Sequence, residues 1–193
     1  VDEIHSLYVE QWDLEKVIEE SDRTIDYLKE TVKSIYKSIR QTSIMIKQKY
    51  QFLSIDLPKT IYFITSQELE DLYPTLEPKQ REELITKDKK AVFIIGIGDK
   101  LKSGKPHDLR SPDYDDWSLD GDMLIYDKDL DKAIEISSMG IRVDEFSLLD
   151  QLEKTKSTDK ITLPYHQKIL KKQIPYTIGG GIGQSRLLML LLG

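Results

Sequence analysis

The feature that most constrains this chain is a run of glycines near its end, where a β-prone segment passes directly into an apolar helix. The segment from Tyr176 to Ile178 favours a strand, four glycines follow within five positions, and the helix that comes next carries Arg186 in its first turn. Glycine lets the backbone approach a ligand closely or adopt a positive φ angle, and a helix start offers N–H groups to an anion. The pattern predicts a binding site for a nucleotide phosphate.

The spacing of these glycines excludes the two commonest nucleotide motifs. A Walker loop requires a lysine directly after its last glycine, and none is present here. The dinucleotide fingerprint requires a glycine five positions after the first, where Gly179 is followed by Gln184. The remaining pattern is a strand, then the run of glycines, and then a helix whose arginine can hold a phosphate or a carboxylate. Tight packing of a buried helix on a sheet is the alternative interpretation of the glycines.

Composition narrows the remaining classes of function. A chain of 193 residues can form one domain with its own core, and 39% hydrophobic with 32% charged residues is typical of a soluble globular protein. The net charge of -6 works against a broad nucleic-acid surface. The absence of cysteine excludes disulfides, thiolate metal sites and a cysteine nucleophile. No apolar run is long enough to cross a bilayer, so we expect a cytoplasmic protein without a membrane partner.

The periodicity of apolar residues predicts strands alternating irregularly with helices. The expected strands cover residues 5–15, 60–65, 91–97, 121–126, 132–137 and 176–178. The expected helices cover residues 21–50, 65–73, 78–89, 144–155 and 165–172. Two of the strands form a hairpin and no repeated βαβ crossing is present, which predicts an α+β fold with a β-sheet flanked by helices, as a single domain over residues 1–193. In the helix at 144–155, we expect an inward face made of Phe146, Leu148, Leu149 and Leu152.

Polar residues gather in the first strand and in one loop. Alternation puts Gln11 and Asp13 on one face of the first strand, where exposure to solvent is the simpler interpretation. The loop from 100 to 117 places Tyr114 beside Asp115, which could stack a base and hold a ribose or an amine. A polar surface loop stapled by buried aromatic residues is the alternative.

The hairpin brings two acids into the same region of the chain. Asp122 near the start of one strand and Glu135 on the other could face each other, and such a pair suits Mg²⁺ beside an ATP phosphate. A surface pair of acids is the alternative. Arg142 could clamp a carboxylate, or form a structural ion pair with Asp144 or Glu145. The three histidines, His5, His107 and His166, lack metal-ligand spacing and are expected to be structural.

Four segments resemble one known family. The segment from Gly179 to Leu187 closely resembles the third signature motif of class II aminoacyl-tRNA synthetases, in the form used by ammonia-dependent asparagine synthetases. Residues 8–15 are similar to the strand that supplies a Gln and an Asp to the amino-acid pocket, and residues 105–117 resemble the loop bordering the aspartate and ATP pockets. Residues 135–143 carry an arginine seven positions after a glutamate, as in aspartate-type synthetases.

The resemblance implies a class II synthetase-like core with an antiparallel sheet, and it assigns roles to residues. The implied catalytic residues are Arg186, Arg142 and Asp115. The implied aspartate-binding residues are Gln11, Asp13, Ser138 and Arg142. The implied ATP- or AMP-binding residues are Tyr114, Asp115, Asp122, Glu135, Ile136, Ser137, Gly181, Gly183 and Arg186. The implied magnesium ligands are Asp122 and Glu135.

The resemblance also implies a reaction: ATP adenylates the side chain of L-aspartate, and ammonia displaces AMP to give L-asparagine. The alternatives are the catalytic core of an aspartyl- or asparaginyl-tRNA synthetase and a non-catalytic synthetase-like paralogue. No tRNA partner is expected, and the full-length protein is expected to be a homodimer. Family members carry an N-terminal segment and a short C-terminal tail beyond the limits of this chain, so residues 1–193 alone are expected to be inactive and poorly soluble.

Overall fold

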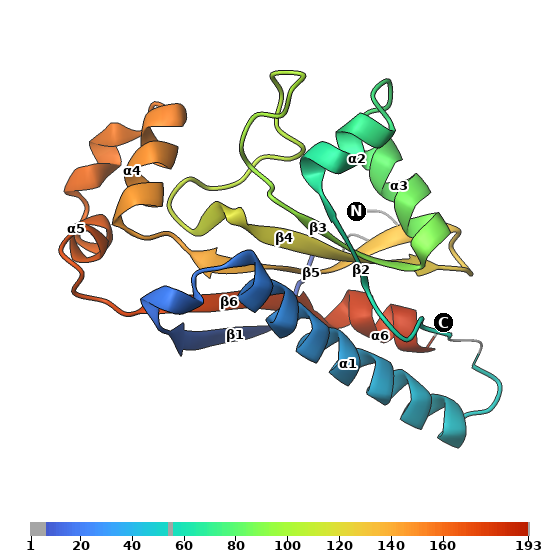
Figure 1. Cartoon of the computed structure of the whole chain (residues 1–193). Helices are drawn as coiled ribbons and strands as arrows, with labels where there is room; N and C mark the ends of the chain where they lie inside the picture. The colour runs from blue at the N-terminus through green and yellow to red at the C-terminus, as the bar shows by residue number, and fades with distance from the viewer. Residues whose placement is uncertain (1–6, 54–55, 193) are drawn as a thin grey trace.

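The computed structural model describes residues 7–53 and 56–192, which form a six-stranded sheet with helices on both faces (Figure 1). The strands are β1 (Gln11–Ile18), β2 (Tyr62–Thr65), β3 (Ala91–Ile95), β4 (Asp115–Asp127), β5 (Lys132–Arg142) and β6 (Tyr176–Gly183). The helices are α1 (Ile25–Lys49), α2 (Ser66–Leu72), α3 (Pro78–Lys89), α4 (Glu145–Lys154), α5 (Pro164–Leu170) and α6 (Gln184–Leu192), with short 3₁₀ turns at Glu20–Asp22 and Thr158–Thr162.

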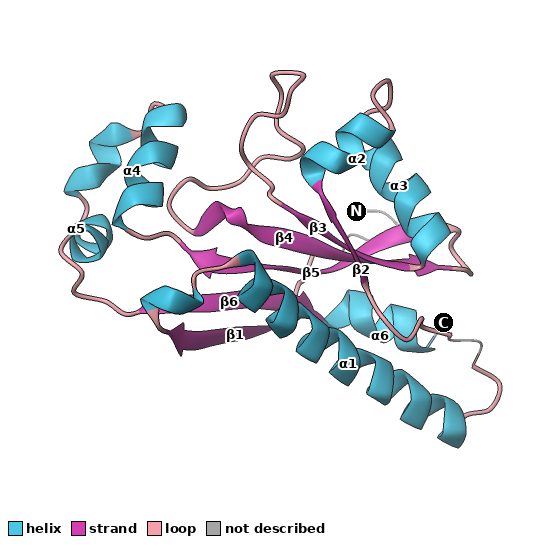
Figure 2. Cartoon of the chain, viewed as in Figure 1, coloured by secondary structure: helices cyan, strands magenta, loops and turns pink. Residues whose placement is uncertain are grey.

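The sheet is mostly antiparallel, in the order β1-β6-β5-β4-β3-β2, and within the described residues only β2 and β3 pair in parallel. The last strand of the chain therefore lies between the first strand and β5. This arrangement places helices and strands in separate layers, as Figure 2 shows, and confirms the predicted α+β fold. No helix in the described ranges is long and apolar enough to span a membrane.

Alternation along β3 and β4 divides the core into two layers. Phe93, Met123 and Ile125 pack with Leu28 and Val32 of α1 on one face of the sheet. On the other face, Val92, Ile94 and Leu124 pack with Leu69 of α2 and Ile85 of α3. Every residue of β3 is buried, because helices cover both faces of the sheet at this strand.

Most helix ends follow local chemistry that the sequence predicts. Thr65 and Glu68 form a capping box at the start of α2, and Pro78 is the first residue of α3. The long helix begins at Ile25 rather than at residue 21, because the Thr24 hydroxyl accepts the N–H of Tyr27 after a separate 3₁₀ turn. The first strand covers residues 11–18 rather than 5–15, and the predicted residues 5 and 6 lie outside the described ranges.

One predicted helix face is wrong. Leu148 and Leu152 of α4 are buried as expected, but Phe146 is 71% exposed and Leu149 is 41% exposed. The third inward position belongs to Gln151, which is 2% exposed. Its amide donates to the backbone oxygens of Pro112 and Asp115. A polar side chain with satisfied hydrogen bonds thus replaces an apolar one on the packed face.

The glycines that were expected to separate the last strand from the last helix are part of the strand. β6 continues through the glycines to Gly183, and the described glycines with positive φ are Gly96, Gly98 and Gly104. The glycines of β6 are required for close approach instead: a Cβ at Gly180 would collide with Met139 and lie 2.6 Å from the Ser138 carbonyl oxygen. A Cβ at Gly183 would meet nothing closer than 3.9 Å.

We predict that Gly180→Ala lowers the free energy of unfolding by about 2 kcal/mol or more, because the added methyl group forces β5 and β6 apart. Gly183→Ala is the matched control in the same strand, and its effect should stay within about 0.5 kcal/mol. Urea denaturation followed by circular dichroism measures both. Equal losses in the two variants would contradict the close-approach explanation.

Candidate active site

A cavity of about 600 Å³ opens between β1, β5, β6 and the loop formed by residues 97–114. Its lining includes the predicted site residues Gln11, Asp13, Tyr114, Asp115, Glu135, Ile136, Ser137, Ser138, Gly181, Gly183 and Arg186. The two predicted site residues that do not line it, Asp122 and Arg142, form ion pairs with residues that do. Sequence segments separated by most of the chain therefore meet around one cavity.

The floor of the cavity is built on the glycines of β6. Gly181 pairs with Asp13 of β1 on one side and with Ser138 of β5 on the other. A Cβ on Gly181 would lie 2.9 Å from both Asp13 Oδ1 and Gln11 Oε1. Because Gly181 has no side chain, the polar groups of β1 can lie across β6 and reach the cavity. Gln11 and Asp13 are exposed, as the alternation along the strand predicts, and both line the cavity.

Arg142 lies behind the floor, held between two carboxylates. Its Nη2 is 2.7 Å from Glu15 Oε2, and its Nη1 pairs with Asp115, while its guanidinium lies 4.0 Å from the centre of the Tyr114 ring. Although burial opposes its charge, these acids hold the pKa of Arg142 above its ordinary value. The structural ion pair with Asp144 or Glu145 is not formed.

Arg23, and not Arg142, forms the ion pair with Asp144. Its Nε lies 3.1 Å from Asp144 Oδ2, and its Nη1 donates to the backbone oxygen of Arg142. With its Nη2 2.9 Å from Asp116 Oδ2, this buried arginine joins the end of β5 to the start of α4 and to β4. Arg23 thereby fixes the backbone on which Arg142 is mounted.

The acid pair shares one face of the sheet because of a β-bulge. Asp122 pairs with Ser138, whereas Leu124 pairs with Glu135, so that Ile136 is the extra residue of β5. In a regular ladder, Leu124 would pair with Ile136, and Glu135 would point to the opposite face. The bulge shifts the register by one residue and turns Glu135 to the side of Asp122. The two residues are diagonal neighbours rather than directly opposite, which corrects the predicted facing arrangement.

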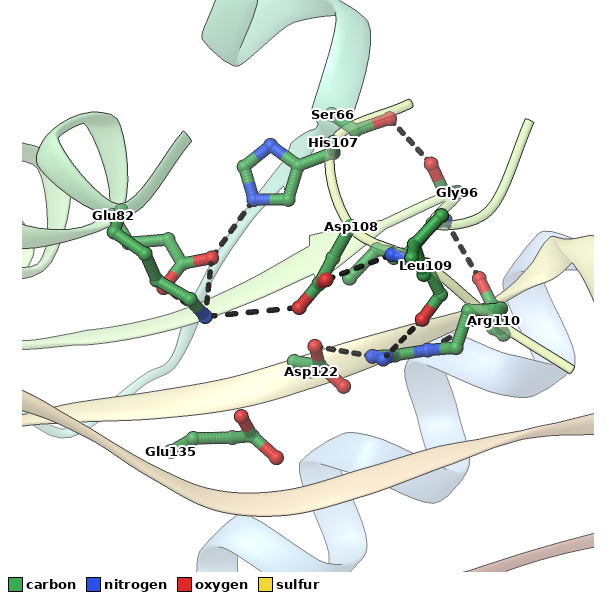
Figure 3. Close-up of polar contacts among 12 residues, drawn as sticks. Ser66, Glu82, Gly96, His107, Asp108, Leu109, Arg110, Asp122 and Glu135 are labelled. Atoms are coloured by element: carbon green, nitrogen blue, oxygen red, sulfur yellow. Dashed lines mark hydrogen bonds and ion pairs between the residues drawn. The ribbon is translucent and has the colours of Figure 1, made fainter. Parts of the chain in front are cut away.

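Asp122 is the more buried member of the pair, with 4% of its surface exposed. Its Oδ2 pairs with Arg110, and its Oδ1 is buried without a hydrogen-bond partner among the described residues (Figure 3). Burial, reinforced by the charge of Glu135, raises the pKa of Asp122 to about 6 despite the opposing effect of Arg110. An acid in this state is poised to accept a cation.

These two acids fit a magnesium site that a ligand completes. Hard carboxylate oxygens are the donors that Mg²⁺ prefers, and the unpartnered Oδ1 of Asp122 is available to one. Within the described residues, no group of three or more His, Cys, Asp or Glu side chains could hold a metal ion. Phosphate oxygens and water would therefore have to supply the remaining ligands.

Arg186 lines the cavity beside Glu135. From the first turn of α6, its Nη1 donates to the backbone oxygen of Glu135 at 2.9 Å and lies 4.0 Å from the Glu135 carboxylate. The helix start itself is not fully open to an anion, since the N–H of Gln184 donates to the backbone oxygen of Glu10. The charge of Arg186, more than the free N–H groups, marks this end of the cavity.

Two functional residues were not assigned from the sequence. Arg110 lines the cavity and pairs with Asp122, and its position in the polar loop at 100–117 was the available signal. Gln151 fixes the loop end by its bonds to Pro112 and Asp115, and it accepts the N–H of Trp117 at 2.9 Å. A glutamine in a helix gives no sequence signal for this role. His107 and His166 each lie beside a carboxylate, whereas His5 lies outside the described residues.

Comparison with known proteins identifies close relatives of the whole chain. A family model described as aspartate-ammonia ligase matches residues 1–193. The aspartate–ammonia ligase of Lactobacillus johnsonii is 56% identical over 194 residues, which cover 100% of this chain and 58% of that protein. The enzyme of the same name from Clostridium perfringens strain 13 is 57% identical over 192 residues, covering 100% of this chain and 57% of that protein. The chain thus spans somewhat more than half the length of these relatives.

Solved structures of class II synthetases share the fold. The aspartyl-tRNA synthetase of Entamoeba histolytica superposes with a TM-score of 0.60 at 19% identity, covering 100% of this chain and 42% of that chain. The asparaginyl-tRNA synthetase of Pyrococcus horikoshii, solved with asparaginyl-adenylate, gives a TM-score of 0.57 at 17% identity, covering 93% of this chain and 43% of that chain. The predicted class II synthetase-like core is confirmed.

The raised pKa of Asp122 predicts a pH-dependent stability. A carboxyl whose pKa is higher in the folded state holds its proton more tightly there, so its ionisation lowers the free energy of unfolding. This loss is absent below about pH 4 and grows as the pH rises to about 6. In metal-free buffer at about pH 7.5, we expect Asp122→Asn to raise the free energy of unfolding by up to ~3 kcal/mol, and at about pH 4 to change it little. Denaturant titrations at both pH values measure this difference.

The control for this experiment is Asp150→Asn, which alters an exposed acid of α4. It should show no gain in stability at either pH. A Asp122→Asn variant that is less stable than the parent at both pH values would contradict the raised pKa.

Proposed function

The chain belongs to the aspartate–ammonia ligase family, and from this premise we propose that it forms the catalytic core of an enzyme that makes L-asparagine from L-aspartate, ATP and ammonia. The reaction would pass through a β-aspartyl-adenylate, with release of pyrophosphate and then of AMP. The observation that carries the proposal is that a single cavity joins the polar residues on either side of the glycine strand to Glu135 and Arg186.

Aspartate would bind at the end of the cavity formed by β1, β5 and β6. Gln11, Asp13 and Ser138 offer acceptors and donors on either side of Gly181, where an amino group and a carboxylate could be held. Arg142 would hold the carboxylate that does not react. Glu15, whose side chain is 47% exposed, now occupies one edge of that guanidinium and would have to yield it to the substrate.

The nucleotide would bind beside the aspartate and extend to the other end of the cavity. Tyr114 has one ring face against Arg142 and is 55% exposed, so it could stack a base, while Asp115 lies beside it. Arg186 would hold a phosphate, with Asp122 and Glu135 as magnesium ligands and Ile136, Ser137 and Gly183 as neighbouring walls. Bound Mg²⁺ would neutralise charge on the phosphates. The described side chains would then act by orienting the two substrates and excluding water.

Two alternatives are less well supported. An aspartyl- or asparaginyl-tRNA synthetase core shares the fold, but the net charge of -6 disfavours a broad tRNA surface. A non-catalytic paralogue would have no need of the buried Asp122 beside Glu135, which is costly for stability. For the full-length protein we propose a homodimer, in keeping with the exposed apolar side chains Trp12 and Val17 on the edge strand β1.

The overall reaction is tested with the longest natural protein that contains this chain. We expect AMP release that requires both aspartate and ammonia and that does not change when tRNA is added. Chromatographic measurement of AMP and asparagine decides the point. Release that depends on tRNA would favour the synthetase alternative, and no release under any condition would favour the paralogue.

The magnesium assignment is tested by Glu135→Gln. Removing one carboxylate of the pair should lower ATP–pyrophosphate exchange by at least about 100-fold, because charge at the phosphates is no longer neutralised. Glu153→Gln, at an exposed position of α4, is the matched control and should exchange at the parent rate. Parent-like exchange in Glu135→Gln would remove Glu135 from the metal site.

A further inference from the structure

A buried pair that the proposed reaction does not use anchors the loop at residues 97–114 to α3. His107 Nε2 lies 2.9 Å from Glu82 Oε1, and the side chains are 0% and 7% exposed. Lys79 Nζ lies 2.9 Å from the second oxygen of Glu82, so this carboxylate is held by two partners. Figure 3 shows His107 on the Glu82 side of the loop and Arg110 on the side of Asp122.

The hydrogen-bond partners of His107 indicate how the ring is used. Its Nδ1 is buried and has no hydrogen-bond partner among the described residues. Because a carboxylate only accepts hydrogen bonds, the Nε2 of His107 is the donor to Glu82. A hydrogen bond to a carboxylate is stronger than one between neutral groups.

The anchor lies close to Arg110 along the chain. Only Asp108 and Leu109 intervene, so the Cα atoms of His107 and Arg110 are separated by at most about 11 Å. Leu109 is 81% exposed, and Asp108 forms a 3.8 Å ion pair with the exposed Lys79 and accepts the backbone N–H of Leu109 at 2.7 Å. On the far side, the backbone oxygen of Ser111 accepts from Trp117 Nε1 at 3.3 Å. The buried anchor at His107 therefore fixes the start of the short segment that carries Arg110.

Arg110 in turn balances the acids at the nucleotide end. It pairs with Asp122, and its Nε lies 3.9 Å from Asp120 Oδ2. Asp120 is 1% exposed, and its Oδ2 has no hydrogen-bond partner among the described residues. Without a guanidinium at this place, two buried carboxylates would meet an incoming polyphosphate with like charge.

We propose that His107 is a positioning residue for the nucleotide: by docking on Glu82, it holds Arg110 over Asp122. The inference rests on the proposed function for the identity of the nucleotide. Removing the anchor loosens residues 108–110 and weakens ATP binding, while the aspartate end of the cavity, built on β1, β5 and β6, keeps its geometry.

The same loop provides a matched control. His166 of α5 is 4% exposed, its Nε2 lies 3.0 Å from Asp113 Oδ2, and its Nδ1 likewise is buried without a partner within the described residues. It anchors the other end of the loop, two residues before Asp115. A general loosening of the loop would affect variants of both histidines alike, whereas the proposal separates them.

The test compares His107→Leu, His107→Gln, His166→Leu and the parent, each in the longest natural protein that contains the chain. Calorimetry gives the dissociation constant for ATP with magnesium, steady-state kinetics gives KM for ATP and for aspartate, and hydrogen exchange follows the amides of residues 108–110. His107→Leu should raise the dissociation constant and KM for ATP about tenfold, with faster exchange and an unchanged aspartate KM. His107→Gln retains an amide donor near the Nε2 position and should recover most of the affinity.

The proposal is overturned if His107→Leu binds ATP like the parent, if His166→Leu gives the same ATP defect, or if His107→Gln fails to rescue. Should His107→Leu fail to fold, Glu82→Ala, which removes the acceptor, replaces it and is expected to show the same ATP defect. A parent that neither binds ATP nor releases AMP counts against the proposed function instead. In that case the exchange rates of residues 108–110 still decide whether the anchor holds the loop, since unchanged rates in His107→Leu reject it.

Discussion

The site depends on a strand in which half of the residues are glycine. β6 lies between β1 and β5, and its glycines allow polar groups of both neighbours to occupy the space above it. At Gly179, a Cβ would collide with Glu15 and lie 2.5 Å from Arg142 Nη2, so this ion pair crosses β6 only because the position is bare. At Gly181, the same condition admits Gln11 and Asp13. The cavity is thus created by what the central strand omits, while the flanking strands supply the chemistry.

Three arginines balance the acids in and behind the cavity. Arg142 balances Glu15 and Asp115, Arg110 balances Asp122, and Arg186 approaches Glu135. Burial nevertheless raises the pKa of Asp115, Asp120 and Asp122, because the guanidinium groups only partly offset the loss of solvent. Such an arrangement favours ligands that bring cations to one end and both an amino group and a carboxylate to the other.

The sequence is informative where a local rule decides the structure. Caps at Thr65 and Pro78 and the apolar run of β3 required no knowledge of the rest of the chain. The membership of the cavity was also predictable, through its resemblance to a family. The inward face of α4 was not, because Gln151 is buried to serve backbone groups far along the chain. The partners of Arg142 were not predictable either, because Glu15 reaches it across a strand from the other end of the sequence.

The bulge at Ile136 makes the register of β5 as important as its composition. Glu135 lies on the side of Asp122 because Ile136 interrupts the ladder between the pairs Met123–Ser137 and Leu124–Glu135. A regular ladder that kept Ile136 would pair Glu135 with Ile125 and turn the glutamate toward the layer packed against α1. Deletion of Ile136 would instead close the bulge and leave Glu135 opposite Leu124. The effect of an insertion or deletion in this hairpin therefore depends on the register that it leaves more than on the residue that it adds or removes.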